Sequence, residues 1–277
     1  MRTHLVHATP YGPEPGLRYE QAGNLPVYRF DALDGGPRLA HAVFTRLGGV
    51  SLPPFASLNL GGTVGDDPQA VQANTERVCG ALGIRPGQTV ACHLTHSADV
   101  LVVWAAERGR VVGRGDALVT AEPGVMLSMR FADCVPIILH EPRRGAVGLA
   151  HAGWRGTLKN VAGATVGAMV NALGCSAQAI TAVIGPAIGP CCYQVGLEVI
   201  QAAETGLDRG QELFQRRNGQ TAYFDLWEAN RRQLLAAGVG RVTLSGLCTA
   251  CRTDHFFSHR AEWGRTGRFG VVIGYRE

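Results

Sequence analysis

The sequence predicts an α+β fold in which mixed β-sheets pack in layers with flanking helices, all within a single domain. Hydrophobic residues make up 46% of the 277 residues and charged residues only 17%, which is enough apolar surface for a layered core. Short apolar runs typical of strands are interspersed with helical patterns, and this order favours α+β. No internal repeat, charge block or low-complexity linker divides the chain.

The first residues predict a loose N-terminal arm over 1–23, with the domain spanning 24–277. The arm is rich in proline and glycine and lacks the apolar segment of a signal peptide. No stretch approaches the length of a membrane span. Eight cysteines in a chain without an export signal are typical of a reducing compartment. We therefore expect a cytoplasmic protein that does not bind membranes.

The pattern along the chain predicts most elements in order. The first strand is expected at 39–45, and the Gly/Pro/Ser-rich loop that follows is expected to be ordered because it carries function. Asp67 and Pro68 are typical of a helix N-cap and first turn. A further helix is expected to begin near Thr157, and two or three more follow the turn PAIGPCC. The other expected strands are 89–94, 100–104, 116–120, 125–131, 135–140, 146–150, 180–185, 242–246 and 270–275.

The charge distribution argues against nucleic acid as a partner. The formal net charge is only +4, and Lys159 is the one lysine among 26 basic residues. The arginines are scattered, and no basic stripe with interleaved aromatic residues is present.

Three residues at predicted strand ends form a candidate metal site. His96 and Cys134 follow strands, and His151 ends one, so a sheet could present all three to a common point. One thiolate and two imidazoles make a good zinc set, and three protein ligands leave a fourth position free, as in catalytic sites. The three residues are 38 and 17 positions apart. That spacing alone also fits packed core residues.

Two arginines are candidates for binding an anion such as phosphate. Arg155 lies in the segment HAGWRGT, where Gly153 and Gly156 allow close backbone approach and a helix follows. Arg46 lies in FTRLGGVS. A glycine turn with a surface arginine explains the first segment equally well, and an ordinary salt bridge explains the second.

The other cysteines favour structural explanations. Cys248 and Cys251 form a CxxC pair with His255 and His259 downstream, but the spacing is too short for a zinc finger. We expect buried thiols near a turn. Cys191 and Cys192 are expected to serve packing beside a proline-fixed turn, because adjacent cysteines rarely chelate one ion together.

Several segments together resemble a known family. GGVSLPPFASLNLGGTVGDDPQAVQAN, DALVT, ADCVPI, HAGWRGT, IGPAIGPCCYQVG and FFSHR…TGR occur in order from about residue 38 to 275. They resemble the YfiH-like family, also called the laccase-domain or multicopper polyphenol oxidase family, some members of which are named peptidoglycan editing factor.

The resemblance implies a zinc-dependent enzyme that acts on purine nucleosides. Family members are described as phosphorylases for adenosine, inosine and 5′-methylthioadenosine, with an adenosine deaminase activity besides. The family's metal ligands fall on His96, Cys134 and His151. For these activities Asp133 is the candidate for moving a proton, and Arg46 or Arg155 for holding phosphate.

One departure from the family concerns the first ligand. The usual Gln-Val-His-Gly is Leu94-Thr95-His96-Ser97 here, and the lost glutamine amide is expected to alter contacts around the metal or the choice of substrate. His93 lies close by, but its offset from the motif makes it the poorer ligand candidate.

Three other functions fit parts of the sequence. The first is a copper-dependent polyphenol oxidase: copper would suit the ligand set, yet the nine histidines include no His-x-His pair of a laccase-type centre. Cys134 could instead be the nucleophile, with His151 as its base, in a hydrolase that edits peptidoglycan precursors. A binding module without turnover is the third possibility.

Overall fold

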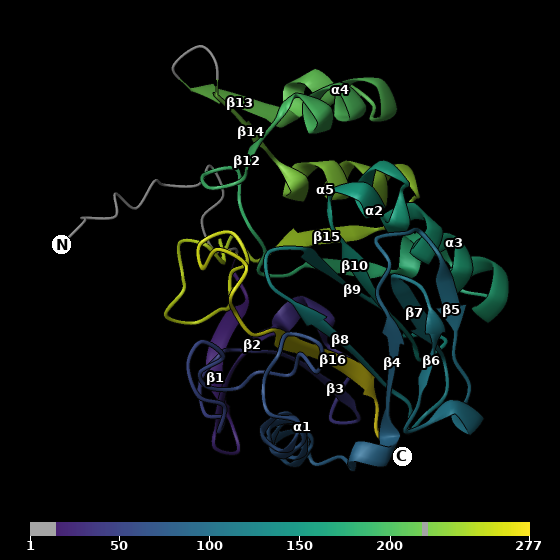
Figure 1. The fold of residues 1–277 in the computed structure, drawn as a ribbon. Coiled ribbons are helices and arrows are strands. Elements are labelled where there is room, and N and C mark those ends of the chain that lie inside the picture. The colour runs from purple at the N-terminus through teal and green to yellow at the C-terminus, as the bar shows by residue number, and fades with distance from the viewer. Residues whose placement is uncertain (1–14, 218–220) are drawn as a thin grey trace.

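The computed structural model describes residues 15–217 and 221–277, which form three β-sheets and five α-helices (Figure 1). The helices are α1 (Pro68–Leu82), α2 (Trp154–Leu158), α3 (Val161–Leu173), α4 (Leu197–Gly206) and α5 (Leu226–Ala236). Within the described ranges, no helix combines the length and the apolar character needed to cross a membrane.

Sixteen strands are present in these ranges. They are β1 (Leu17–Ala22), β2 (Leu25–Phe30), β3 (Leu39–Phe44), β4 (Thr89–His93), β5 (Val100–Val102), β6 (Val111–Arg114), β7 (Ala117–Thr120), β8 (Met126–Phe131), β9 (Val135–Glu141), β10 (Ala146–Ala152), β11 (Thr181–Ile184), β12 (Gln194–Val195), β13 (Phe214–Arg217), β14 (Thr221–Phe224), β15 (Arg241–Leu244) and β16 (Phe269–Tyr275).

The sheets are mixed, which confirms the predicted fold class. A seven-stranded sheet has the order β1-β2-β3-β16-β8-β4-β6, a six-stranded sheet β15-β11-β9-β10-β7-β5, and a small sheet β12-β14-β13. Most neighbours are antiparallel, but β4 runs parallel to both β6 and β8, β5 to β7, and β11 to β15.

The two large sheets pack face to face through a shared apolar core. Phe131 and Val271 of the seven-stranded sheet belong to the same buried cluster as Leu149 of the six-stranded sheet. Side chains alternate along a strand. On β9, Ile138 therefore faces the other sheet, whereas Ile137 packs on the opposite side.

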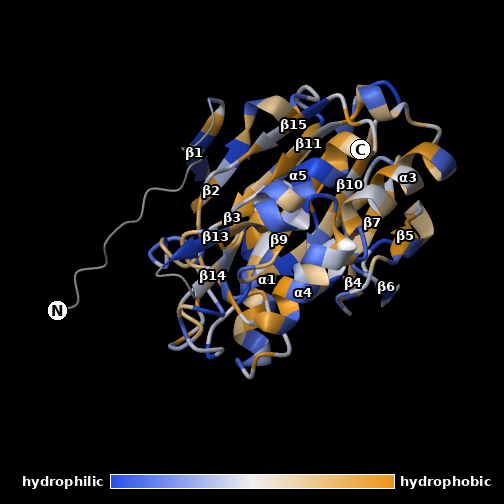
Figure 2. Cartoon of the chain, turned by 90° about the horizontal axis from the view of Figure 1, so that it is seen from above, coloured by the Kyte–Doolittle hydropathy of each residue, from blue (hydrophilic) through white to orange (hydrophobic). Residues whose placement is uncertain are grey.

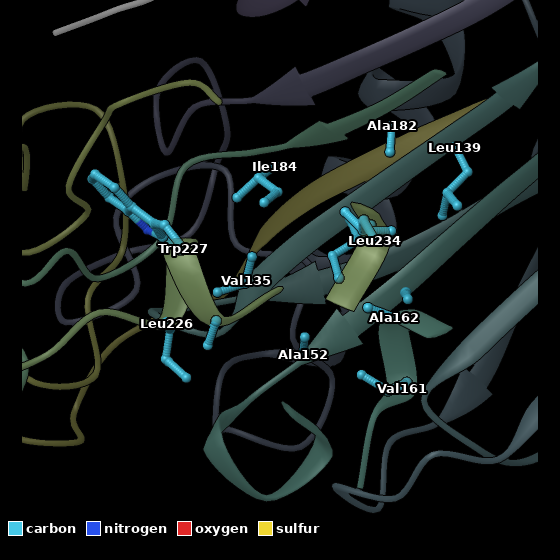
Figure 3. Packing of buried hydrophobic residues seen from close by; sticks show 14 of the residues in the cluster. Val135, Leu139, Ala152, Val161, Ala162, Ala182, Ile184, Leu226, Trp227 and Leu234 are labelled. Carbon is cyan, nitrogen blue, oxygen red and sulfur yellow. The ribbon is translucent and has the colours of Figure 1, made fainter. Parts of the chain in front are cut away.

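Helices cover the outer faces of both sheets. Figure 3 shows Val135 and Leu139 of the six-stranded sheet beneath Val161 of α3 and Leu234 of α5. On the far side of the molecule, α1 packs against β2 and β3 of the seven-stranded sheet. The result is a helix–sheet–sheet–helix order, with hydrophobic colour concentrated on inner strands such as β7 and β10 (Figure 2).

Several elements differ from the sequence expectations, because β1, β2, β6, β12, β13 and β14 are not among the expected strands. Residues 17–22 form β1, paired antiparallel with β2, so the expected loose arm does not include them, and residues 1–14 lie outside the described ranges. The helix expected near Thr157 is interrupted. It begins at Trp154 as α2, and α3 starts anew after Asn160, whose φ is 59° and whose side chain accepts a hydrogen bond from the Gly163 N–H.

Candidate metal centre

His96, Cys134 and His151 meet at one edge of the stacked sheets. One potential ligand atom from each lies within 4.8 Å of the others. His96 follows β4, Cys134 lies in the short turn between β8 and β9, and His151 lies near the end of β10. The distant segments converge because β4 neighbours β8 in one sheet and β9 neighbours β10 in the other.

Strand register places the thiol beside the second histidine. On the β9–β10 ladder Val135 pairs with Ala152 and Pro136 with His151. One residue further, Cys134 therefore lies opposite Gly153. A Cβ added at Gly153 would sit 3.0 Å from the Cys134 Sγ and 3.1 Å from the His96 Nδ1. The absence of a side chain at Gly153 leaves room for the ligands to converge.

The backbone is unusual next to two of the ligands. His96 has a φ of 56°, and Asp133, directly before Cys134, has a φ of 86°. Non-glycine residues seldom adopt this left-handed region, and such conformations cluster at functional sites. Here they turn the ligand side chains toward the common point.

Asp116 orients two of the ligands and was not recognised from the sequence as a site residue. Its Oδ1 lies 3.0 Å from the His151 Nδ1. Its Oδ2 accepts hydrogen bonds from the backbone N–H groups of Thr95 and Ser97, which flank His96, at 3.0 and 2.7 Å. Asp116 starts the motif DALVT, but its role becomes visible only through its contacts. A carboxylate behind a metal-binding histidine is a common supporting arrangement.

The departure from Gln-Val-His-Gly has a local consequence. The hydroxyl groups of Thr95 and Ser97 both lie within hydrogen-bonding distance of the Asp116 Oδ2, at 3.1 and 3.2 Å. Leu94 lines the adjoining pocket. The residues that differ from the family motif therefore contact the Asp116 carboxylate behind the site (Thr95 and Ser97) or line the pocket in front of it (Leu94).

Anionic neighbours favour a cation at His151. Burial by itself lowers the pKa of His151, but the neighbouring Cys134 and Asp116 outweigh it and raise the pKa to about 9. Burial would also raise the pKa of Asp116, yet hydrogen bonds from His151, Ser97 and Thr95 lower it overall. A metal cation that displaces the His151 proton would meet the same partners. The His₂Cys donor set, the Asp116 carboxylate behind His151 and the open side toward a pocket fit a catalytic zinc.

A pocket of about 520 Å³ opens onto these ligands. Its lining combines the ligands with arginines and aromatic side chains. The residues are Thr63, Leu94, His96, Arg130, Ala132, Asp133, Cys134, His151, Gly153, Trp154, Arg155, Ile188, Tyr193, Leu226, His259, Arg260 and Arg268.

The arginines in the pocket differ in how many hydrogen bonds their guanidinium groups already donate to other protein groups. Arg260 donates to the Gln194 carbonyl at 2.7 Å, and Arg268 donates to the carbonyls of Thr266 and Gly267. Arg155 stacks over Trp154 and has one long contact, 3.9 Å, with Glu198. Arg130 is partly buried, and no described residue accepts a hydrogen bond from its guanidinium. Arg130 was not predicted from the sequence.

Arg46, the other arginine singled out from the sequence, is not among the residues that line this pocket. Its guanidinium donates to Glu262 at 2.9 Å and to the carbonyls of Ala56 and Thr253 at 3.0 Å, and it lies over the Phe257 ring. The structure thus brings Arg155 to the metal ligands but not Arg46.

Asp133 lines the pocket and is held by three hydrogen bonds. The hydroxyls of Thr249 and Ser258 donate to its Oδ1, each at 2.7 Å, and the Arg260 N–H donates to its Oδ2 at 2.6 Å. Burial raises the pKa of Asp133 against the effect of these donors. The side chain therefore ties the turn before Cys134 to the segments of Thr249, Ser258 and Arg260.

The chain belongs to the family of the multi-copper polyphenol oxidoreductase laccase model, which matches residues 40–276. It is 43% identical over 256 residues to the purine nucleoside phosphorylase YlmD of Geobacillus stearothermophilus, covering 88% of this chain and 93% of that protein. It is 42% identical over 261 residues to a purine nucleoside phosphorylase of Deinococcus radiodurans, covering 94% of each.

Solved structures of similar proteins have the same fold as this chain. The crystal structure of YlmD from Geobacillus stearothermophilus superposes with a TM-score of 0.88 at 39% identity, over 94% of this chain and 99% of that one. The Bacillus licheniformis hypothetical protein YfiH superposes with a TM-score of 0.85 at 34% identity, over 90% and 96%.

Proposed function

We propose that this chain is a zinc-dependent purine nucleoside phosphorylase that also deaminates adenosine. It would cleave adenosine, inosine and 5′-methylthioadenosine, working in the cytoplasm as one catalytic domain that includes β1 as well as residues 24–277. The observation that carries the proposal is a three-ligand His₂Cys site that opens directly onto a pocket lined by arginines. The names of the similar proteins support the same chemistry.

In phosphorolysis an oxygen of phosphate bonds to the sugar C1′, and the bond from C1′ to the purine nitrogen breaks. The electron pair of that bond stays on the nitrogen, which takes up a proton as the free base leaves. Arg130 and Arg155 supply guanidinium donors for phosphate at the pocket, and such charge-assisted bonds favour planar bidentate contacts with oxyanions.

The remaining pocket residues suit a nucleoside. Trp154 and Tyr193 offer aromatic surface, and purine rings stack well on such side chains. The bound zinc would supply a Lewis acid with one coordination position left for substrate or water. Asp133, with its raised pKa, would take up and return the proton moved during deamination.

The test measures products and metal together. Purified protein incubated with inosine and inorganic phosphate is expected to release hypoxanthine and ribose 1-phosphate in equal amounts, and to release neither without phosphate. Adenosine in the absence of phosphate is expected to yield inosine and ammonia. Hypoxanthine release that does not depend on phosphate would refute the phosphorylase proposal.

Arg130→Gln tests the anion site within that assay. Loss of one charge-assisted hydrogen bond corresponds to roughly 1.5–3 kcal/mol, so kcat/KM for phosphate should fall about tenfold or more, whereas adenosine deamination should change little. An equal loss in both reactions would contradict a phosphate-specific role. Gln72→Ala, at an exposed position of α1, serves as the matched control.

A hydrolase that uses the thiol directly is the second candidate, because the Cys134 Sγ and a ring nitrogen of His151 lie within 4.8 Å of each other. Such an enzyme would keep its activity after removal of metal by a chelator, whereas the proposed phosphorylase would lose it. Metal analysis of the purified protein also decides between zinc and copper at the site.

A further inference from the structure

Four cysteines far from each other in sequence converge at the ends of two neighbouring strands. Cys191 and Cys192 end the turn after β11, and Cys248 and Cys251 follow β15. Because β11 and β15 are parallel neighbours, the turns that follow them begin at the same end of the sheet. An isolated bridge between Ala187 and Cys248 extends this pairing.

The convergence differs from what the sequence predicted. Cys251 is exposed, not buried, and Cys191 and Cys192 do more than pack beside a proline. All four sulfurs lie within 4.8 Å of one another, and they form a second group apart from the His96–Cys134–His151 site. Neither cysteine pair signals this on its own, because the partner pair lies more than fifty residues away.

The sulfur separations match metal coordination. The Cys251 Sγ lies 3.4 Å from that of Cys192 and 3.6 Å from that of Cys191. A tetrahedral zinc with Zn–S bonds of about 2.3 Å separates its sulfurs by about 3.8 Å. A disulfide requires about 2.05 Å, and all four cysteines are free thiols in the structure.

A backbone donor and a glycine shape the space around the sulfurs. The Gly189 backbone N–H donates to the Cys248 Sγ at 3.3 Å, and a hydrogen bond of this kind stabilises a metal-bound sulfur. A Cβ added at Gly189 would lie 3.3 Å from the Cys191 Sγ and 2.9 Å from the Trp227 ring, so this close approach depends on glycine. Exposed Cys251 gives a cation access to the otherwise largely buried group.

We propose that Cys191, Cys192, Cys248 and Cys251 bind a second, structural zinc ion. With four protein ligands the coordination is closed, which is the pattern of a structural site and leaves no position for substrate. This proposal does not depend on the proposed enzymatic activity.

The zinc would fix two segments that build the wall of the pocket. Ile188 and Tyr193, on either side of the first cysteine pair, both line the pocket. Thr249, between the second pair, donates to Asp133, the neighbour of Cys134 in the other site. Crosslinking the two turns through one ion would therefore hold both the wall and the Asp133 carboxylate in place.

The test counts metal in the full-length protein purified under reducing conditions. The wild type should contain two zinc ions per chain, and Cys134→Ala, which removes a ligand of the other site, should retain one. X-ray absorption at the zinc edge of Cys134→Ala should show only sulfur neighbours, at about 2.3 Å. Absence of zinc from this variant, or a shell that contains nitrogen, would overturn the proposal.

Further variants separate the two sites. Cys251→Ser or Cys192→Ser should each reduce the wild-type content from two ions to one, whereas Cys175→Ala, at a buried cysteine outside both groups, should leave two. Full metal content in both serine variants would contradict the proposal. So would a Cys192–Cys251 or Cys191–Cys251 disulfide found by peptide mapping of the reduced preparation. Because Cys134→Ala lacks the first site, these results do not depend on nucleoside turnover.

Discussion

At the scale of single residues, Gly153 leaves the space in which the side chains of the three proposed ligands converge. The replacement Gly153→Ala would put a Cβ 3.0 Å from the Cys134 Sγ and 3.1 Å from the His96 Nδ1. In the proposed site neither side chain could move away from the added Cβ without lengthening its bond to the metal. We expect zinc affinity to fall at least tenfold, measured by competition with a chromogenic chelator.

The control for this variant is Gly167→Ala. Gly167 lies within α3, and a Cβ there meets no atom within 4 Å. Alanine in place of a helical glycine typically stabilises by about 0.5–1 kcal/mol. Zinc affinity should therefore be unchanged and the melting temperature equal or slightly higher. Unaltered zinc affinity in Gly153→Ala would show that the site tolerates the added methyl group.

The pKa of His151 predicts how metal binding depends on pH. Because Cys134 and Asp116 raise this pKa to about 9, the metal-free protein keeps His151 protonated below that pH. Zinc must displace the proton, so its apparent affinity should rise by up to about tenfold per pH unit for this one proton and level off above about pH 9. Chelator competition from pH 6 to 10 measures the profile.

Asp116→Asn should change this profile in a defined way. Without the carboxylate the pKa of His151 falls, so the plateau should begin at lower pH. The plateau affinity itself should fall by roughly 10–100-fold, because the partner that orients the ring is weakened. A plateau that starts at the same pH as in the wild type would mean that Asp116 does not hold the proton on His151.

At the scale of elements, α1 anchors the long loop that precedes it. Asn74 is fully buried on α1. Its Oδ1 accepts from the Val50 N–H at 2.9 Å, and its Nδ2 donates to Ser51 and to the carbonyls of Ser57 and Asn59. These contacts explain why a loop rich in glycine and proline has a defined course, as expected from the sequence.

Asn74→Ala should be strongly destabilising, because it leaves several buried polar groups without partners. We expect a loss of about 3 kcal/mol in the free energy of unfolding, measured by urea denaturation. Gln72→Ala, on the exposed side of the same helix, should stay within about 0.5 kcal/mol of the wild type. A similarly small effect at Asn74 would show that the loop does not depend on this anchor.

The same scale explains what the sequence could predict. Inner strands such as β9 and β10 carry continuous apolar runs because both of their faces are buried, and these were predicted closely. Exposed, polar β1 and the short strands β6, β12, β13 and β14 have no such signal and were not predicted. The largely buried β2 was not predicted either. The break between α2 and α3 depends on the capping of α3 by Asn160, and the spacing of apolar residues along the sequence does not predict such a cap.

The site was predicted in part for a similar reason. The convergence of His96, Cys134 and His151 could be predicted because each stands where a strand stops and family motifs surround them; that they bind a metal stays a prediction. Asp116, Arg130 and the four-cysteine group depend on which strands become neighbours in the folded sheets, and spacing along the chain does not determine that. Arginine is a common anion-binding residue, but the guanidinium of Arg46 already donates hydrogen bonds to Glu262 and to two backbone carbonyls.

At the scale of the whole molecule, the two stacked sheets bring the site together. The seven-stranded sheet supplies the segment of His96, the six-stranded sheet supplies His151, and Cys134 lies where the chain passes from one sheet to the other. The shared core between the sheets therefore fixes the distance between the ligands. Metal binding and the packing of the two sheets are expected to be coupled for this reason.

The most direct test is an anomalous difference map from crystals grown with zinc, with data on both sides of the zinc absorption edge. We predict a peak about 2.3 Å from the Cys134 Sγ and about 2.0–2.1 Å from one ring nitrogen each of His96 and His151, open toward the pocket. A zinc-loaded crystal with no peak at this point, or with Cys134 beyond bonding distance of it, would contradict the account.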